Sequence, residues 1–160
     1  MNLTPGKLAD QARKYDELNG HLTFRISHLS KLLEVEAALR LGGSGFNLTS
    51  YRMMMVIEIF DEITVSDLSR IMLIDRAQIS RAASDLIERG VLLAGADRSS
   101  KRKKLLRLSE DGKRAFDDLR LRFDDRQKEI ESLLARDDLN GLWNAIETVS
   151  DHLVERIEAG

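Results

Sequence analysis

The fold of this chain is decided by the stretch VSDLSRIMLIDRAQISRAASDLIERGV, residues 65–91. Thr64 stands three residues before Asp67, which is the spacing of a capping box, where a side-chain oxygen accepts a hydrogen bond from a backbone N–H of the first helical turn. The same spacing recurs at Asp75 and Gln78. These two patterns predict one helix that begins near residue 65 and, after a short turn, a second helix that begins near residue 75.

The second predicted helix covers Asp75–Arg89 and has two different faces. Gly90 marks its end, because a helix that closes with a left-handed residue favours glycine there. At 1.5 Å per residue the helix is about 22 Å long. Its apolar residues recur three and four apart and predict the face that packs on the core: Ile79, Ala82, Ala83, Leu86 and Ile87. The opposite face carries short or polar side chains, Ala77, Gln78, Arg81, Ser84 and Asp85, with Arg76 and Ser80 at its margins.

A basic hairpin is predicted directly after this helix. Residues 91–93 form a short apolar run, residues 104–108 return as a second strand, and small, polar and charged residues lie between them. Residues 98–104 contain five Lys or Arg and no acid. A cationic hairpin tip beside a helix can contact phosphates or enter the minor groove of DNA. The two helices and the hairpin together predict a winged helix-turn-helix.

The charge distribution predicts double-stranded DNA as the partner. The whole chain has a net charge of −2, yet residues 64–107 hold ten Lys or Arg and five Asp or Glu, a net +5, which leaves −7 for the rest. A basic segment on an acidic scaffold focuses attraction for phosphate onto one surface. We expect the second helix to enter the major groove. The predicted DNA-contacting residues are Arg76, Ala77, Gln78, Ser80, Arg81 and Ser84 on the helix, and Arg98, Lys101, Arg102 and Lys103 in the hairpin.

An ordered set of motifs within residues 22–112 resembles the MarR (multiple antibiotic resistance regulator) family of winged-helix proteins. The set comprises Leu48-Thr49, residues 66–81, residues 86–92, Arg102 and residues 106–112. The resemblance implies a homodimer built from N- and C-terminal helices, with two winged helices that bind a pseudo-palindromic operator. It also implies a repressor released by a small organic effector, usually an organic acid held between the dimer helices and the winged helix. Arg102 corresponds to the family's wing arginine.

Two positions depart from the family pattern. Leu73 stands where the family usually has a glycine in the turn between the two helices. A left-handed leucine at that position would cost about 1 kcal/mol of strain. Ser100 stands where an aspartate often precedes the wing arginine by two residues, so the wing geometry is expected to differ from that of the family.

Further helices are predicted before and after the winged helix. Residues 8–41 form one long helical pattern with an expected break near Asn19-Gly20, and the glycine-rich residues 42–45 end it as a hinge. Thr49 is predicted to cap a helix that ends near Phe60, with Met53 and Met54 in the core rather than in a ligand pocket. Residues 61–63 are predicted to form a short strand that joins the wing sheet.

The helices after the wing complete a mostly α fold with a small β-hairpin wing. Ser109 is predicted to cap a charged helix to about Leu134, and Asp137 or Asp138 to start the last helix. An apolar stripe on that last helix has nothing left in the chain to cover it: Leu139, Leu142, Trp143, Ile146, Val149, Leu153 and Ile157. The first helix leaves a similar stripe at Leu8, Ala12 and Tyr15. Two uncovered stripes predict a homodimer, and the chain divides into dimerisation region 1–45, winged helix 46–112 and dimerisation region 113–160.

Several classes of chemistry are disfavoured by composition. The absence of cysteine excludes disulfides, thiolate zinc sites and thiol oxidation as a sensor. No apolar run is long enough to span a membrane, and the polar N-terminus lacks a secretory core, so a cytoplasmic protein without a membrane partner is expected. Glu17, His21 and His28 share a helix face, but a surface or partly buried histidine is the favoured interpretation over a metal site. With no nucleophile motif, neither an enzyme nor a cofactor is predicted.

The leading prediction is a homodimeric, sequence-specific transcriptional regulator, with repression as the expected mode. The alternative from a different class is a protein-interaction module. In that case the basic hairpin binds an acidic protein surface and the second helix never reads bases.

Overall fold

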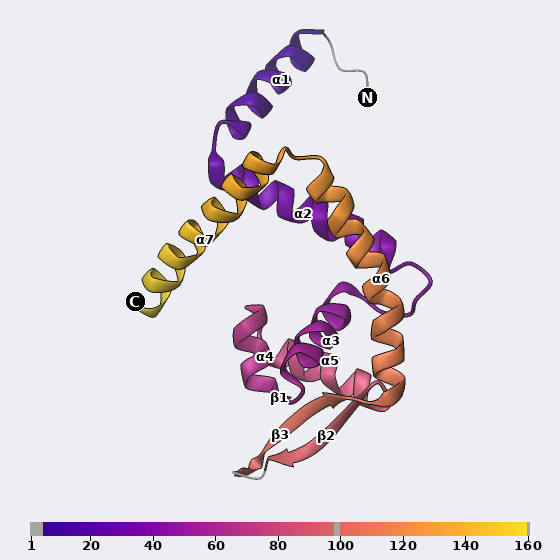
Figure 1. The fold of residues 1–160 in the computed structure, drawn as a ribbon. Helices are drawn as coiled ribbons and strands as arrows, with labels where there is room; N and C mark the ends of the chain where they lie inside the picture. The colour runs from indigo at the N-terminus through magenta and orange to yellow at the C-terminus, as the bar shows by residue number, and fades with distance from the viewer. Residues whose placement is uncertain (1–4, 98–99, 160) are drawn as a thin grey trace. The chain divides into compact units, whose positions relative to one another are not determined.

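The structure is a computed structural model that describes residues 5–97 and 100–159. Its elements, in chain order, are α1 (Pro5–Asn19), α2 (Leu22–Arg40), α3 (Leu48–Phe60), β1 (Ile63–Thr64), α4 (Val65–Met72), α5 (Arg76–Glu88), β2 (Leu92–Asp97), β3 (Ser100–Leu108), α6 (Glu110–Ser132) and α7 (Arg136–Glu158) (Figure 1). The predicted mostly α fold with a small β wing is confirmed. The chain forms two compact units, residues 1–116 and 117–160. The predicted three-part division stays a prediction.

The long N-terminal helical pattern is interrupted where the sequence predicted a break. α1 ends at Asn19, and the Gly20 N–H donates to the carbonyls of Asp16 and Glu17, both at 3.1 Å. α2 then runs to Arg40 and ends in the glycine-rich turn, where Gly43 and Gly45 both have φ of +77°. A positive φ is strained for residues with a Cβ, which accounts for glycine at these two positions.

The cap of α3 is Asn47, and the prediction of Thr49 was wrong. Asn47 is extended, with φ −99° and ψ 171°, and its side-chain oxygen accepts a hydrogen bond from the Ser50 N–H at 2.8 Å. Thr49 already lies inside the first helical turn, where its backbone is helical and its side chain cannot play that role.

The core of the first unit is built where α3, α4 and α5 meet the sheet. Its largest fully buried side chains are Met53, Met54 and Ile57 from α3, Leu68 from α4, Ile79 and Leu86 from α5, and Leu92 and Leu106 from the strands. Met53 and Met54 are each 0% exposed, which confirms the core interpretation of these methionines. Fully burying a side chain of this size contributes about 1.5–3 kcal/mol, so this cluster fixes α5 on the scaffold.

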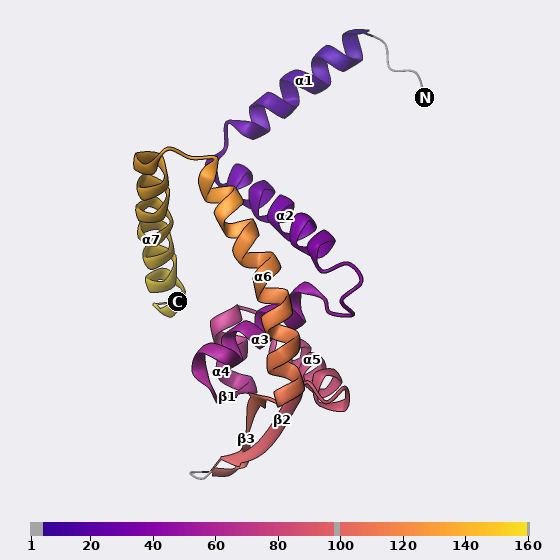
Figure 2. The ribbon, with the colours of Figure 1, turned by 45° about the vertical axis from the view of Figure 1, so that its right-hand side comes forward.

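The three strands form one antiparallel sheet in the order β1-β3-β2. A short strand joins the wing as predicted, with Ile63 of β1 opposite Leu106 of β3. It covers Ile63–Thr64 rather than residues 61–63, because Asp61 and Glu62 form the bend that follows α3. Leu92 of β2 pairs with Leu108 at the base of the hairpin, and the register shifts between Ala96 and Asp97 near its tip. In Figures 1 and 2 the hairpin extends away from α3, α4 and α5.

The second unit contains the C-terminal part of α6 and all of α7. α7 begins at Arg136, one residue before the earlier of the two predicted starts, and Ala135 before it supplies no side-chain cap. Asp137 and Asp138 instead lie in the first turn, where the helix dipole favours carboxylates. No residue from Arg136 to Glu158 is buried, and Trp143 is 54% exposed. In the part of the chain that the structure describes, no helix is long and apolar enough to cross a membrane.

Candidate nucleic-acid interface

Both predicted caps of the helix-turn-helix are confirmed. The Thr64 hydroxyl accepts a hydrogen bond from the Asp67 N–H at 3.1 Å and donates to the Asp67 carboxylate at 2.6 Å. Asp75 Oδ1 accepts from the N–H groups of Ala77 at 2.8 Å and Gln78 at 3.2 Å. Each cap of this kind contributes about 0.5–2 kcal/mol. The two caps therefore fix where α4 and α5 begin.

The turn between α4 and α5 passes through a left-handed leucine. Leu73 has φ 52° and ψ 40°, and its side chain is 87% exposed. Ser69 holds this turn from the preceding helix: its carbonyl accepts from the N–H groups of Leu73 and Ile74, and its hydroxyl donates to the Ile74 carbonyl at 2.7 Å. These hydrogen bonds offset the strain of about 1–2 kcal/mol that a left-handed leucine carries.

The two predicted faces of α5 are present in the structure. Ile79 and Leu86 are 0% exposed and Ala83 is buried, whereas Ala82 is half-buried. Ile87 was wrongly assigned to the core, because it lies at the margin of the buried stripe and is exposed. All residues predicted for the outer face are exposed: Arg76, Ala77, Gln78, Ser80, Arg81, Ser84 and Asp85.

The polar groups on that outer face differ in how far they are already engaged. The Ser84 hydroxyl donates to the Ser80 carbonyl at 3.0 Å, and the Asp85 carboxylate pairs with Arg89 at 3.2 Å. Among the described residues, neither Arg76 nor Arg81 forms an ion pair. These two guanidinium groups are therefore available for a ligand outside the chain.

The tip of the wing carries the remaining predicted contacts. Arg98 lies outside the described residues, and the side chains of Lys101, Arg102 and Lys103 lie outside the described side chains. Their DNA contacts stay predictions. Closer to the base, Leu106 and Leu108 are buried while Arg107 between them is exposed, so β3 alternates as a half-buried strand does.

The base of the wing is joined tightly to the end of α5. The Ser109 N–H donates to the Val91 carbonyl at 3.0 Å, and the Ser109 hydroxyl donates to the Gly90 carbonyl at 2.6 Å. The same hydroxyl accepts from the Gly112 N–H at 2.9 Å, which confirms Ser109 as the cap of α6. Gly112 lies so close that an added Cβ would be 2.1 Å from the Val91 carbonyl oxygen. Sequence patterns gave no indication of this close approach.

Arg89, at the end of α5, was not among the predicted site residues. Its guanidinium donates to the Gly45 carbonyl, pairs with Asp85 and lies over the Phe46 ring. The first and last of these contacts join segments that are more than forty residues apart, and no local pattern indicates them.

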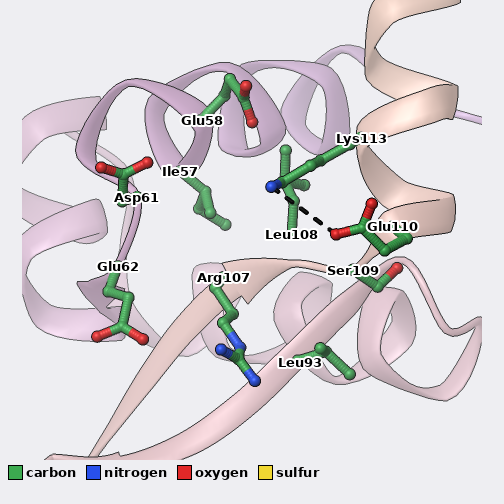
Figure 3. A pocket seen from close by; sticks show the side chains of 10 residues that line it. All are labelled: Ile57, Glu58, Asp61, Glu62, Leu93, Arg107, Leu108, Ser109, Glu110 and Lys113. Atoms are coloured by element: carbon green, nitrogen blue, oxygen red, sulfur yellow. Dashed lines mark ion pairs between the residues drawn. The ribbon is translucent and has the colours of Figure 1, made fainter.

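A cavity of about 420 Å³ lies behind the wing, within the first unit. Figure 3 shows Glu110 and Lys113 of α6 on one side of it, and Asp61 and Glu62, which follow α3, on the other. Lys113 Nζ lies 3.9 Å from the Glu110 carboxylate. The lining of this cavity has a net charge of −2, because it holds four acids and two cations. The acids are Glu58, Asp61, Glu62 and Glu110, and the cations are Arg107 and Lys113. That charge disfavours an organic acid as its occupant.

His21 directly precedes α2, His28 lies within α2 and His152 lies within α7. Among the described residues, no group of three or more His, Cys, Asp or Glu side chains could hold a metal ion. The His28 ring lies against Phe24, with 6.0 Å between the ring centroids. An aromatic neighbour is an ordinary setting for a partly exposed histidine.

Three solved structures illustrate what the chain is similar to. A MarR family transcriptional regulator from Silicibacter pomeroyi DSS is 18% identical with a TM-score of 0.75, covering 97% of this chain and 95% of that one. CouR from Rhodococcus jostii RHA1, solved with p-coumaroyl-CoA, is 22% identical with a TM-score of 0.74, covering 82% and 93%. A mutant of MarR from E. coli, solved with operator DNA, is 17% identical with a TM-score of 0.71, covering 78% and 91%.

At these identities the three structures establish the fold, a winged helix with terminal helices. A search of curated protein sequences gives no match. Residues 44–103, which contain α3, the helix-turn-helix and most of the wing, match the sequence model of the MarR family. The winged-helix part of the chain, residues 44–103, is therefore similar to the MarR family of winged helix-turn-helix transcription regulators.

Proposed function

We propose that this chain acts as a homodimer that binds a pseudo-palindromic operator and represses transcription until a small organic effector releases it. The observation that carries the proposal is the pair of faces on α5. Ile79 and Leu86 are fully buried and hold the helix, while Arg76, Gln78 and Arg81 project from the opposite, exposed face. A helix held in this way presents its outer face as a unit to the major groove.

The residue types on that face suit base readout. Arginine binds the O6 and N7 atoms of guanine with two hydrogen bonds, and glutamine binds adenine in the same way. Ala77 and Ser80 have short side chains near the start of α5, so the backbone there can approach the base edges. In this proposal Arg76, Gln78 and Arg81 read bases, and Ser84 makes a further DNA contact on the same helix. The hairpin cations Lys101 and Lys103 bind phosphate, and Arg98 is a further DNA contact of the hairpin. Arg102 enters the minor groove, where a guanidinium suits the strongly negative potential.

Exposed apolar surface supports the homodimer. Along α7, Trp143, Ile146, Val149 and Leu153 are each at least 44% exposed. A continuous apolar stripe of this length is uncommon on the surface of a monomer. Tyr15 of α1 is 50% exposed, while the side chains of Leu8 and Ala12 lie outside the described side chains. In this proposal residues 1–45 and 113–160 provide the dimer helices, and two winged helices read half-sites about one helical turn apart.

The similar structures support the two ligand classes in the proposal. One relative was solved with operator DNA and another with p-coumaroyl-CoA. Operator DNA agrees with the exposed face of α5. The structure with p-coumaroyl-CoA supports an organic effector that contains an acyl group.

The test is selection of bound fragments from a genomic duplex library, followed by titration of the selected duplex and of a random duplex at the same salt concentration. The proposal expects one palindromic motif, bound at least about 1,000-fold more tightly than the random duplex. Weak binding that is equal for both duplexes contradicts it and supports the alternative, an interaction module that does not read bases. Salt concentration must be matched, because phosphate contacts alone change affinity steeply with salt.

A further inference from the structure

We propose that Arg89 is a positioning residue for base readout. It holds the C-terminal end of α5 against the turn at residues 42–47 that joins α2 to α3, and thereby sets how the outer face of α5 meets the major groove. This inference rests on the proposed function, since it assumes that α5 reads bases.

Three contacts converge on the Arg89 guanidinium. Nη2 donates to the Gly45 carbonyl at 3.0 Å, across 44 residues of sequence. Nη1 donates to the Asp85 carboxylate at 3.2 Å, one turn earlier on α5. The guanidinium carbon lies 4.6 Å from the centroid of the Phe46 ring. A planar, forked cation can make all three contacts at once, whereas a lysine ammonium on a flexible stem cannot.

The turn at residues 42–47 is itself held at both ends. The Ser44 hydroxyl donates to the Leu41 carbonyl at 2.6 Å and accepts from the Phe46 N–H at 3.1 Å. Leu41 is buried at the end of α2, and Asn47 caps α3. A continuous series of contacts therefore runs from the end of α2 through Ser44 and Phe46 to the end of α5.

The contacts of Arg89 are better suited to orientation than to stability. The Arg89 side chain is 36% exposed and that of Asp85 is 60% exposed, and partly exposed ion pairs contribute little to folding because water screens them. The buried residues Ile79 and Leu86 already attach α5 to the core. Base readout is more demanding, because hydrogen-bonding groups must lie within about 0.5 Å of their productive positions.

A second role for Arg89, direct contact with a DNA phosphate, makes different predictions. Loss of one phosphate contact lowers the affinity for all duplexes and reduces the salt slope by about one unit. Loss of orientation lowers only the affinity for the operator and leaves the salt slope unchanged. Phe46→Leu separates the two roles, because it removes the ring under the guanidinium without changing any charge.

The experiment measures operator and random-duplex affinities over a salt series, with thermal unfolding, for the full chain and four variants: Arg89→Ala, Arg89→Lys, Phe46→Leu and Arg114→Ala. Arg114→Ala is the matched control, because it removes an exposed guanidinium whose ion pair is with Asp111, three residues earlier on α6. We expect Arg89→Ala and Phe46→Leu to lose about tenfold or more of operator affinity. Random-duplex affinity should change less than about twofold, with parental salt slopes. Arg89→Lys should not restore the loss, and Arg114→Ala should match the parent.

Three results overturn the inference and leave the proposed function standing. The first is parental operator affinity in Arg89→Ala, and the second is a lower salt slope in Arg89→Ala together with full rescue by Arg89→Lys. Operator loss that is matched by a large fall in melting temperature in both Arg89→Ala and Phe46→Leu also overturns it, because the contacts would then be structural. A parent chain that shows no preference for any duplex overturns the proposed function, and the inference fails with it.

Discussion

Gly112→Ala should destabilise the protein, although alanine is ordinarily the better helix former. In an exposed helix this change stabilises by about 0.5–1 kcal/mol. Here the new Cβ would lie 2.1 Å from the Val91 carbonyl oxygen, and real Cβ contacts under 3.0 Å are essentially never observed. The start of α6 must therefore move away from Val91 by about 0.9 Å, the difference between these two distances, or the Val91 carbonyl must rotate.

Either movement weakens the hydrogen bonds that join the wing to α5. The Ser109 N–H bond to Val91 and the Ser109 hydroxyl bond to Gly90 each contribute about 0.5–1.5 kcal/mol. Overpacking against backbone typically costs about 1–3 kcal/mol. After subtraction of the gain in helix propensity, we expect a net loss of about 1–3 kcal/mol. For a chain of 160 residues this lowers the melting temperature by about 2–12 °C.

The assay is calorimetry or denaturant unfolding of the variant beside Gly141→Ala. Gly141 lies inside α7 with nothing within 4 Å of an added Cβ. It also lies about 100° around the helix from Leu142, off the apolar stripe. The control should gain about 0.5–1 kcal/mol. A Gly112→Ala variant that is as stable as the parent or more stable would show that the junction is more compliant than its geometry indicates.

Four further predictions concern the turn, the DNA contacts and the assembly. Leu73→Gly should stabilise the chain by up to about 1 kcal/mol, since it relieves left-handed strain at an exposed side chain; a clear loss in denaturant unfolding contradicts this. Arg81→Ala should cost about 1–3 kcal/mol on the operator and far less on random duplex in titration, and equal losses argue against base readout. Lys103→Ala should lower the affinity for all duplexes equally and reduce the salt slope by about one unit. Arg102→Ala should lower affinity most for sites with A·T-rich flanks. If both variants bind the operator within about twofold of the parent, the wing is only a solvated loop. Truncation after Leu134 should give a monomer or an insoluble chain in sedimentation, and an intact dimer excludes α7 from the interface.

Features set by neighbouring residues could be predicted from the sequence. The caps at Thr64 and Asp75 depend on residues three positions away, and the two faces of α5 follow from helical periodicity alone. The left-handed Leu73 was anticipated only because the family has glycine in that turn. The cap of α3 was misplaced, since Asn47 and Thr49 are both good cap residues and the choice depends on the path of the chain leaving Gly45.

Features set by distant contacts could not be predicted in this way. The Arg89 contact to Gly45 spans 44 residues, and local composition does not encode which carbonyl a guanidinium will reach. The close approach of Gly112 to Val91 depends on how β3 returns to the end of α5. The exposed apolar stripe of α7 was predictable from its spacing, but spacing alone does not identify the surface that covers it.

The junction at Ser109 has a consequence for how this protein can be altered. Ser109 contacts Gly90 and Val91, so the hairpin between residues 92 and 108 is a loop whose two ends are fastened to each other. Lengthening a closed loop costs little, about 0.6 kcal/mol for each doubling. Insertions at the hairpin tip, including peptide tags or additional basic residues, should therefore leave the placement of α5 unchanged. Evolution and protein engineering alike could use the tip as an exchangeable segment, altering affinity for the flanks of a site without redesigning the helix between them.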